Sequence, residues 1–264
     1  MGEIHHAVFG WVTPAVSYFV ACLGAFVALR ATRWALLSEG RTKRKWLLFA
    51  STSLGAGIWS MHFIAMLGFA VTGARIRYDV VLTVLSLVVA IAVVGLGILT
   101  VGYSENAVGA LLAGGTATGL GVAAMHYMGM AAVELPGHIH YDRVTVGVSV
   151  LIAVFAATAA LWAALNIRGT LAVLAAAPVM GVAVCAMHYT GMAAVSVSLS
   201  AGHEAPGGVR ALQIIFPLAV ALGCYVFFGS LAFAAAPSRP AAHQPVLVGP
   251  APQLVPRRRV VADR

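Results

Sequence analysis

Charged side chains are scarce in this sequence. They make up 9% of its 264 residues, whereas a soluble domain carries roughly 25%. Hydrophobic residues supply 61% of the chain, and the mean hydropathy is +0.94. The composition excludes an ordinary soluble domain and predicts a protein that crosses the membrane several times.

Three further absences narrow the class. The long apolar runs lack the alternation of polar and apolar residues that marks the strands of a membrane barrel. The three cysteines, Cys22, Cys185 and Cys224, form no CxxC pair and lie within apolar runs, so we expect them to act as small hydrophobes. The N-terminus lacks a basic region and a small-residue cleavage pattern, so we do not expect a cleaved signal peptide.

Seven apolar runs are each long enough to cross the hydrocarbon layer, which takes about 20 residues of helix. Helix is expected because a spanning segment must satisfy its own backbone hydrogen bonds. The sequence therefore predicts an all-α membrane protein with seven transmembrane helices. The predicted spans are about 10–30, 46–70, 79–102, 107–133, 144–166, 171–199 and 211–235.

The net charge of +8 arises from basic residues gathered on one side of these spans. Of the 16 Lys and Arg, 12 lie after the first span, after the fifth span or in the C-terminal tail, and four lie on the other side. The four are Arg75, Arg77, Arg143 and Arg210. The positive-inside rule then places the N-terminus outside and the C-terminus in the cytoplasm. The charge indicates topology and contact with anionic lipid, and we expect no binding to nucleic acid.

One short phrase occurs three times near the outer ends of spans two, four and six. It reads Met61-His62-Phe63-Ile64-Ala65-Met66, Met125-His126-Tyr127-Met128-Gly129-Met130 and Met187-His188-Tyr189-Thr190-Gly191-Met192. The histidines lie 64 and then 62 residues apart. An ionisable residue inside a membrane is costly, and it is by default a candidate functional residue.

The spacing predicts three two-helix repeats plus one N-terminal helix. Because each repeat holds two spans, all three share one orientation, and their histidines should lie at similar depth around a pseudo-threefold axis. The expected organisation is an outer N-terminus at 1–9, a membrane domain at 10–235 with repeats at about 46–102, 107–166 and 171–235, and a disordered Pro- and Arg-rich cytoplasmic tail at 236–264.

On a helix each histidine shares a face with the second methionine of its phrase, four residues on. The small residue between them lets a neighbouring helix come close, so three imidazoles and three thioethers would converge. Thioether beside imidazole suits copper, especially Cu(I), whereas zinc prefers thiolate, imidazole or carboxylate. Haem is possible through axial His and Met ligands. The alternative is structural, with methionine filling the core and histidine in a polar network.

Other polar residues are expected on the outer side. His5, His6, His138, His140, His203 and Glu204 fall in the outer N-terminus and loops. They either pass metal toward the membrane site or simply face solvent. Tyr127 and Tyr189 are candidates for cofactor binding as donors that orient a ligand, or for interface aromatics.

The phrase, its threefold recurrence and its place in alternate spans resemble the MHYT domain family, and Met187-His188-Tyr189-Thr190 spells the name in full. The resemblance covers about residues 10–235 and implies a multi-pass sensor in the bacterial inner membrane. It implies copper held by Met and His residues, and a diatomic gas ligand (O2, CO or NO) or a redox signal. The implied ligands are Met61, His62, Met66, Met125, His126, Met130, Met187, His188 and Met192.

The sequence departs from the family pattern in two ways. Phe63 and Ala65 replace the Tyr and Gly of the phrase, so the first repeat should pack differently. Many relatives carry a cytoplasmic output domain that this sequence lacks, so we expect signalling through a separate partner. Alternatives are a copper transporter or copper-handling accessory protein, and a haem-binding protein. We find no paired carboxylates, no nucleophile beside a base and no nucleotide-binding loop in the sequence, so we do not expect an enzyme.

Overall fold

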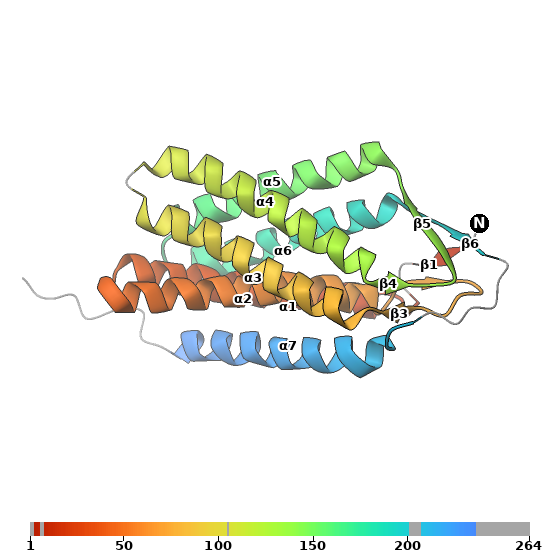
Figure 1. Cartoon of the computed structure of the whole chain (residues 1–264). Helices are drawn as coiled ribbons and strands as arrows, with labels where there is room; N and C mark the ends of the chain where they lie inside the picture. Colours follow the sequence, from red (N-terminus) through yellow and green to blue (C-terminus); the bar gives the residue numbers. More distant parts are fainter. Residues whose placement is uncertain (1–2, 6–7, 105, 201–206, 236–264) are drawn as a thin grey trace, which may run out of the picture.

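In the computed structural model, seven helices form one bundle with a small group of strands at one end (Figure 1). The structure describes all residues except 1–2, 6–7, 105, 201–206 and 236–264. The expected disordered tail and the candidates His6, His203 and Glu204 lie outside the described residues. The helices are α1 (Val12–Leu36), α2 (Gly40–Met66), α3 (Val80–Tyr103), α4 (Ala107–Ala131), α5 (Arg143–Asn166), α6 (Thr170–Ala193) and α7 (Ala211–Ala235).

These seven helices are all long and apolar enough to span a membrane, which confirms the predicted fold class. Their bounds differ from the predicted spans mainly at two places. The α1–α2 hairpin extends further at the end where it turns, and the sixth span ends at Ala193 because residues Val195–Leu199 form a strand. At the strand end, Asp79 and Asp142 begin α3 and α5 by accepting hydrogen bonds from Leu82 N and Thr145 N at 2.7 and 2.8 Å.

Among the described residues, six short strands form three antiparallel pairs, which the sequence analysis did not predict. The strands are β1 (Ile4–His5), β2 (Ala70–Val71), β3 (Arg77–Tyr78), β4 (Val133–Glu134), β5 (Gly137–Tyr141) and β6 (Val195–Leu199). The pairs are β1–β2, β3–β4 and β5–β6. Each pair joins the segment before one helix to the segment after the next, so α1–α2, α3–α4 and α5–α6 are three equivalent hairpins.

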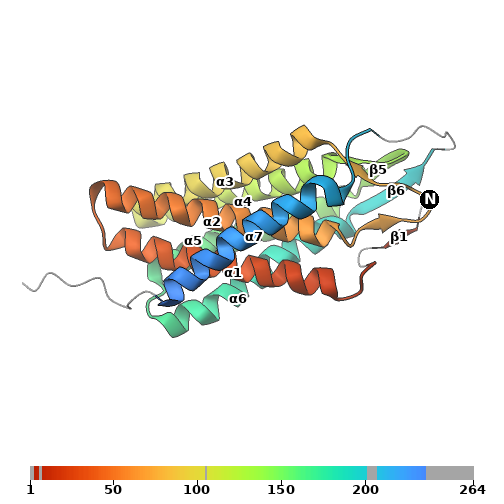
Figure 2. The same ribbon diagram turned by 90° about the horizontal axis from the view of Figure 1, so that it is seen from below.

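The six helices of these hairpins form a closed ring, because each packs against the next and α6 packs against α1. α7 lies outside the ring against α1 and α2 (Figure 2). The repeat in the sequence and the ring in space therefore divide the helices differently. If each repeat begins at the helix that carries the phrase, the repeats are α2–α3, α4–α5 and α6–α7, and α1 belongs to none of them. In the ring, α1 is one of the six helices and α7 is the additional one.

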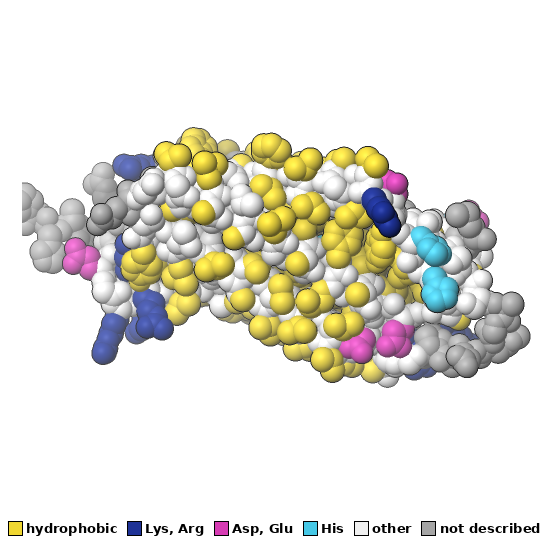
Figure 3. Space-filling view, turned by 45° about the horizontal axis from the view of Figure 1, so that its top comes forward, with side chains coloured by type: hydrophobic (Ala, Val, Ile, Leu, Met, Phe, Trp, Pro, Cys, Tyr) yellow, Lys and Arg dark blue, Asp and Glu magenta, His cyan; other side chains and the backbone are white. Residues whose placement is uncertain are grey.

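The two ends of the bundle differ in charge. We call the end with the strands the capped end, and the opposite end, which holds the α1–α2 and α5–α6 turns, the basic end. Figure 3 shows apolar side chains over the middle of one face and Lys and Arg gathered at the basic end. This is the pattern of a helical bundle that lies across a bilayer with an uneven distribution of basic residues.

Candidate metal centre

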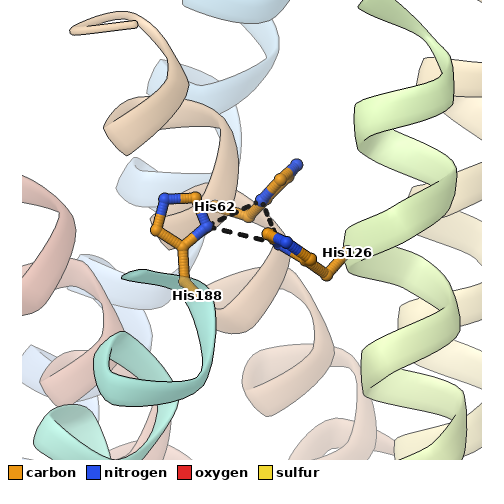
Figure 4. Close-up of side chains that lie close together, drawn as sticks. All are labelled: His62, His126 and His188. Atoms are coloured by element: carbon orange, nitrogen blue, oxygen red, sulfur yellow. Dashed lines mark hydrogen bonds between the residues drawn. The ribbon is translucent and has the colours of Figure 1, made fainter. Parts of the chain in front are cut away.

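The three phrase histidines meet near the capped end of the ring. His62 comes from α2, His126 from α4 and His188 from α6, and their rings point toward one another (Figure 4). The Nδ1 atoms lie 3.0 Å apart between His62 and His188, 3.1 Å between His126 and His62, and 3.4 Å between His188 and His126. The predicted convergence of the three imidazoles is confirmed.

The histidine cluster is shielded from the surroundings. The exposed fractions of His62, His126 and His188 are 1%, 0% and 1%. The aromatic residue that follows each histidine packs edge-on against its ring, with centroid separations of 4.6 Å for Phe63, 4.8 Å for Tyr127 and 4.9 Å for Tyr189. The three repeats thus hold their imidazoles in the same manner, and Phe63 fills this place without a hydroxyl.

Glycines of the phrase make room for the neighbouring imidazole. A Cβ on Gly129 of α4 would collide with Nε2 of His62, and a Cβ on Gly191 of α6 would collide with Nε2 of His126. These two Nε2 atoms are buried and have no hydrogen-bond partner. The hydrogen-bonding capacity of His62 and His126 is therefore directed through Nδ1 into the cluster. The expectation that the small residue allows close approach is confirmed, and the group that approaches is the imidazole itself.

A second set of glycines brings the helices together between the cluster and the basic end. Gly55, Gly119 and Gly181 each lie seven residues, or about two turns, before a phrase histidine. A Cβ on Gly55 would lie 2.8 Å from Cα of Ile91 on α3. A Cβ on Gly119 would meet Val154 of α5, and one on Gly181 would meet α1. These contacts give α1, α3 and α5 equivalent places beside the histidine helices.

Three neutral imidazoles cannot satisfy this arrangement by themselves. A ring nitrogen either carries a proton and donates, or carries a lone pair and accepts. Among three mutually adjacent Nδ1 atoms, at least two must therefore be alike, and the contact between those two is repulsive. Burial strengthens this repulsion because the local dielectric is low. A cation at the centre would instead accept all three lone pairs, so the geometry favours a positively charged ion among the rings.

The dimensions of the cluster fit a single metal ion. The point equidistant from the three Nδ1 atoms lies about 1.8 Å from each, close to the 2.0–2.1 Å of a zinc–imidazole bond. Within the described part of the chain, this is the group of three or more His, Cys, Asp or Glu side chains whose ligand atoms are close enough to share an ion. The donor set is three neutral imidazoles, which suits zinc, copper, iron or nickel.

The six phrase methionines are all buried around this cluster. Met66, Met130 and Met192 lie one turn beyond the histidines and are 1%, 0% and 3% exposed. Met61, Met125 and Met187 are 0%, 1% and 1% exposed. The structure thus places all nine predicted ligands in the core of the bundle and brings the three imidazoles into contact. The role of the methionine sulfurs as ligands stays a prediction.

The hydroxyls of the two tyrosines differ, since that of Tyr127 has a hydrogen-bond partner and that of Tyr189 is buried without one. The Tyr127 hydroxyl forms a 2.6 Å hydrogen bond with Ser149 Oγ of α5, a partner that the sequence analysis missed. The Tyr127 hydroxyl therefore ties α4 to α5. The ring of Tyr189 contacts His188. Both tyrosines support the imidazoles through their rings.

The outer histidines form a different environment. His138 and His140 lie on β5 with exposed side chains, and His140 Nε2 is 2.9 Å from Ser198 Oγ on β6. His5 lies on β1, 3.1 Å from Thr72 Oγ1. The predicted loop around His138 is thus a strand, because β6 provides a pairing partner. Figure 3 shows two histidine side chains side by side at this end.

Comparison with known proteins assigns the phrase to a described family. The profile of the MHYT family, described as "Bacterial signalling protein N terminal repeat", matches residues 55–114, 119–177 and 181–244. Each match includes one phrase histidine. No solved structure matches the chain significantly.

Several curated bacterial proteins are similar in sequence. The chain is 40% identical over 220 residues to the bifunctional diguanylate cyclase/cyclic di-GMP phosphodiesterase MucR of Pseudomonas aeruginosa. The aligned segment covers 79% of the chain and 32% of MucR. It is 37% identical over 194 residues to the cyclic di-GMP phosphodiesterase NbdA of the same species, covering 71% of the chain and 24% of NbdA. It is 28% identical over 200 residues to the signaling protein YkoW of Bacillus subtilis, covering 72% and 24%. The chain thus spans less than a third of these relatives.

Proposed function

The chain belongs to the MHYT family of bacterial signalling proteins, and we propose that it is an integral membrane sensor whose histidine cluster holds copper. The signal is a diatomic gas (O2, CO or NO) or the redox state. The observation that carries the proposal is the set of three buried Nδ1 atoms within 3.4 Å of one another. A copper ion held there would supply a redox-active centre that binds small gases.

The chain's own residues would hold the ion and exclude water from it. His62, His126 and His188 provide three lone pairs, and burial keeps competing water and buffer anions away. The thioethers of the phrase, which are soft ligands buried within about one turn of the histidines, support copper over zinc. A bis-histidine haem is less well supported, since its macrocycle would have to lie between two rings whose nitrogens are 3.0–3.4 Å apart.

The route from the cluster to the basic end runs through α2. This helix carries His62 and contacts α7, where Tyr225 Oη lies 2.8 Å from Thr52 Oγ1. The rings of Phe49 and Tyr225 also pack edge-on at 5.7 Å. A ligand that binds two positions of α2 with different affinity shifts their populations, and α7 would follow. The receiving protein is a cytoplasmic signalling partner if the N-terminus is outside, as the basic end supports.

Copper transport is the alternative function. A transporter needs ligands at several depths, whereas the three histidines form one layer near the capped end. Toward the basic end, the cavity inside the ring is lined by apolar side chains apart from Thr32 and Thr118, and no His, Cys, Asp or Glu is among its lining residues. The distribution of ligands therefore supports a fixed site over a conduction path.

Metal analysis of the detergent-purified chain tests the proposal. We expect about one copper per chain in the wild type and a loss of at least about tenfold in His126→Ala and His188→Ala, because a metal site seldom tolerates the loss of one ligand. The matched control is His138→Ala, which changes an exposed histidine of β5 and should keep the ion.

Four results would contradict this assignment. Stoichiometric zinc in place of copper would change the metal, and a Soret band would indicate haem. Equal metal content in the wild type and His126→Ala would show that the histidine cluster does not hold the metal. Copper accumulation in cells that depends on the protein would favour transport.

A further inference from the structure

An apolar cavity of about 50 Å³ lies inside the ring, between the histidine cluster and the basic end. All six ring helices contribute to its walls, and Met187, the neighbour of His188, is one of the lining residues. Five alanines of α5 make up most of one wall. They are Ala153, Ala156, Ala157, Ala160 and Ala164.

The size and lining of the cavity suit a small apolar molecule. One water-sized molecule needs roughly 10–15 Å³ of such space, so a diatomic molecule fits and a lipid chain does not. Ordered water needs two to four polar partners. Thr32 Oγ1 is buried without a partner, and the other lining hydroxyl, on Thr118, already bonds to Val93 O at 3.2 Å. The walls therefore offer water too few hydrogen bonds, while Thr32 can contact a weakly polar ligand.

A groove on the outer surface lies directly against this cavity. It lies between α5 and α6, and three residues, Ala156, Ala160 and Met180, line both the groove and the cavity. Its outer edge is formed by exposed residues such as Ala159 and Val179. Two alanines and one flexible methionine thus lie between the groove and the cavity.

We propose that this cavity binds an apolar molecule of diatomic size, which dissolves in the bilayer, enters between α5 and α6 beside Met180, and reaches the histidine cluster past Met187. This proposal depends on the proposed function in one respect, namely that the histidine cluster detects the ligand. Binding in the cavity itself requires no metal. Apolar gases concentrate in hydrocarbon, so a lateral route supplies the site from the phase in which they are most soluble.

Xenon is the probe for the cavity, because it binds apolar voids and needs no metal. Three neighbouring alanines of α5 give matched variants of the full chain: Ala157 lines only the cavity, Ala160 lines both, and Ala159 lines only the groove. We expect 129Xe NMR titrations to show saturable binding in the wild type and Ala159→Leu. Binding should weaken by about tenfold or more in Ala157→Leu, where the new side chain fills the void.

The route is tested by kinetics. After loading with Cu(I), the rate of carbon monoxide binding, followed by its infrared stretch, should fall about tenfold or more in Ala160→Leu and stay unchanged in Gly147→Ala, a change on α5 at a residue that lines neither the groove nor the cavity. Ala160→Val, a smaller change, serves if the leucine variant misfolds, as judged by gel filtration and circular dichroism.

The outcomes separate the two proposals. Unsaturable xenon uptake in the wild type, or equal xenon binding in Ala157→Leu, overturns the cavity site whatever the metal content. An unchanged carbon monoxide rate in Ala160→Leu overturns the lateral route. If the wild-type protein binds xenon but holds no copper, the cavity proposal stands and the proposed copper site is wrong.

Discussion

At the capped end of the ring, small residues are covered by side chains that reach across from a neighbouring helix, whereas toward the basic end they face empty space. Gly129 and Gly191 lie directly beneath the imidazoles of His62 and His126. Ala157 and Ala160, on a helix of the same ring, line the cavity. At the capped end, the space left by a small residue is filled by an imidazole from the neighbouring helix. Toward the basic end, no side chain fills the space beside the alanines, and a cavity results.

The largest expected effect is at the phrase glycines. Gly191→Ala would push its methyl group into Nε2 of His126 and displace the cluster nitrogens. We expect Cu(I) affinity, measured by competition with a chelator, to fall about 10- to 100-fold, as for other changes that misplace a ligand.

The matched control is Gly147→Ala on α5, where an added Cβ meets nothing within 4 Å. This variant should keep its affinity and gain up to about 1 kcal/mol of helix stability. Equal affinities in both variants would mean that the close approach of glycine and imidazole does not position the ion.

The next effect tests whether glycine has a purely structural role just below the cluster. Gly119→Ala would force α4 away from the backbone of α5 at Val154. We expect the free energy of unfolding in detergent to fall by about 1–3 kcal/mol, the usual cost of overpacking. Gly223→Ala on α7, where nothing lies within 4 Å, is the control and should show no loss. A stable Gly119→Ala protein would show that the helices can separate without cost.

A smaller effect concerns the tyrosine of the phrase. Tyr127→Phe removes the hydrogen bond to Ser149 but keeps the ring against His126. We expect a loss of about 1 kcal/mol in unfolding free energy and little change in metal affinity. A loss of metal comparable to that of His126→Ala would show that the hydroxyl acts on the ion. The first repeat, with Phe63 at this position, is a natural example of the same change.

The smallest effect lies outside the membrane. The hydroxyl and backbone N–H of Thr145 donate to the Asp142 carboxylate at the start of α5, and these hydrogen bonds lower the pKa of Asp142. The ionised cap thus stabilises the fold above the unfolded pKa, about 3.9 for aspartate, and this contribution is lost as the pH falls through the folded value.

Asp142→Asn keeps the capping geometry without a charge. The difference in melting temperature between wild type and Asp142→Asn should therefore shrink as the pH falls below about 4. A difference that stays constant with pH would exclude an effect of the carboxylate charge.

The histidine site followed from the sequence because its evidence is periodic. The nearly equal spacing of His62, His126 and His188, with two spans in each interval, predicts similar depth and the same orientation. The ring that surrounds them did not follow. The spacing of a repeat does not show where each repeat begins. It therefore cannot decide whether α1 or α7 is the sixth helix of the ring. Gly181 carries that information, because its position two turns before His188 matches Gly55 and Gly119, yet its partner on α1 is visible only in space.

The strands and the cavity were missed for different reasons. Residues Val195–Leu199 alternate apolar and polar side chains, which is typical of a strand. They directly follow the apolar run of α6, so the predicted span absorbed them. The cavity has no local pattern at all. The alanines of α5 are typical of close helix packing, and only the positions of the other five helices show that they leave a void.

The three strand pairs also make each helical hairpin a closed unit. β1–β2, β3–β4 and β5–β6 each fasten the start of a hairpin to its end. A break in the loop at Gly73, between β2 and β3, would therefore leave every pair inside one fragment. Two co-expressed pieces of the protein would each retain complete hairpins, and the imidazole triangle would form only on their reassembly. The protein can thus be divided into two unequal fragments, and metal uptake would report their reassembly.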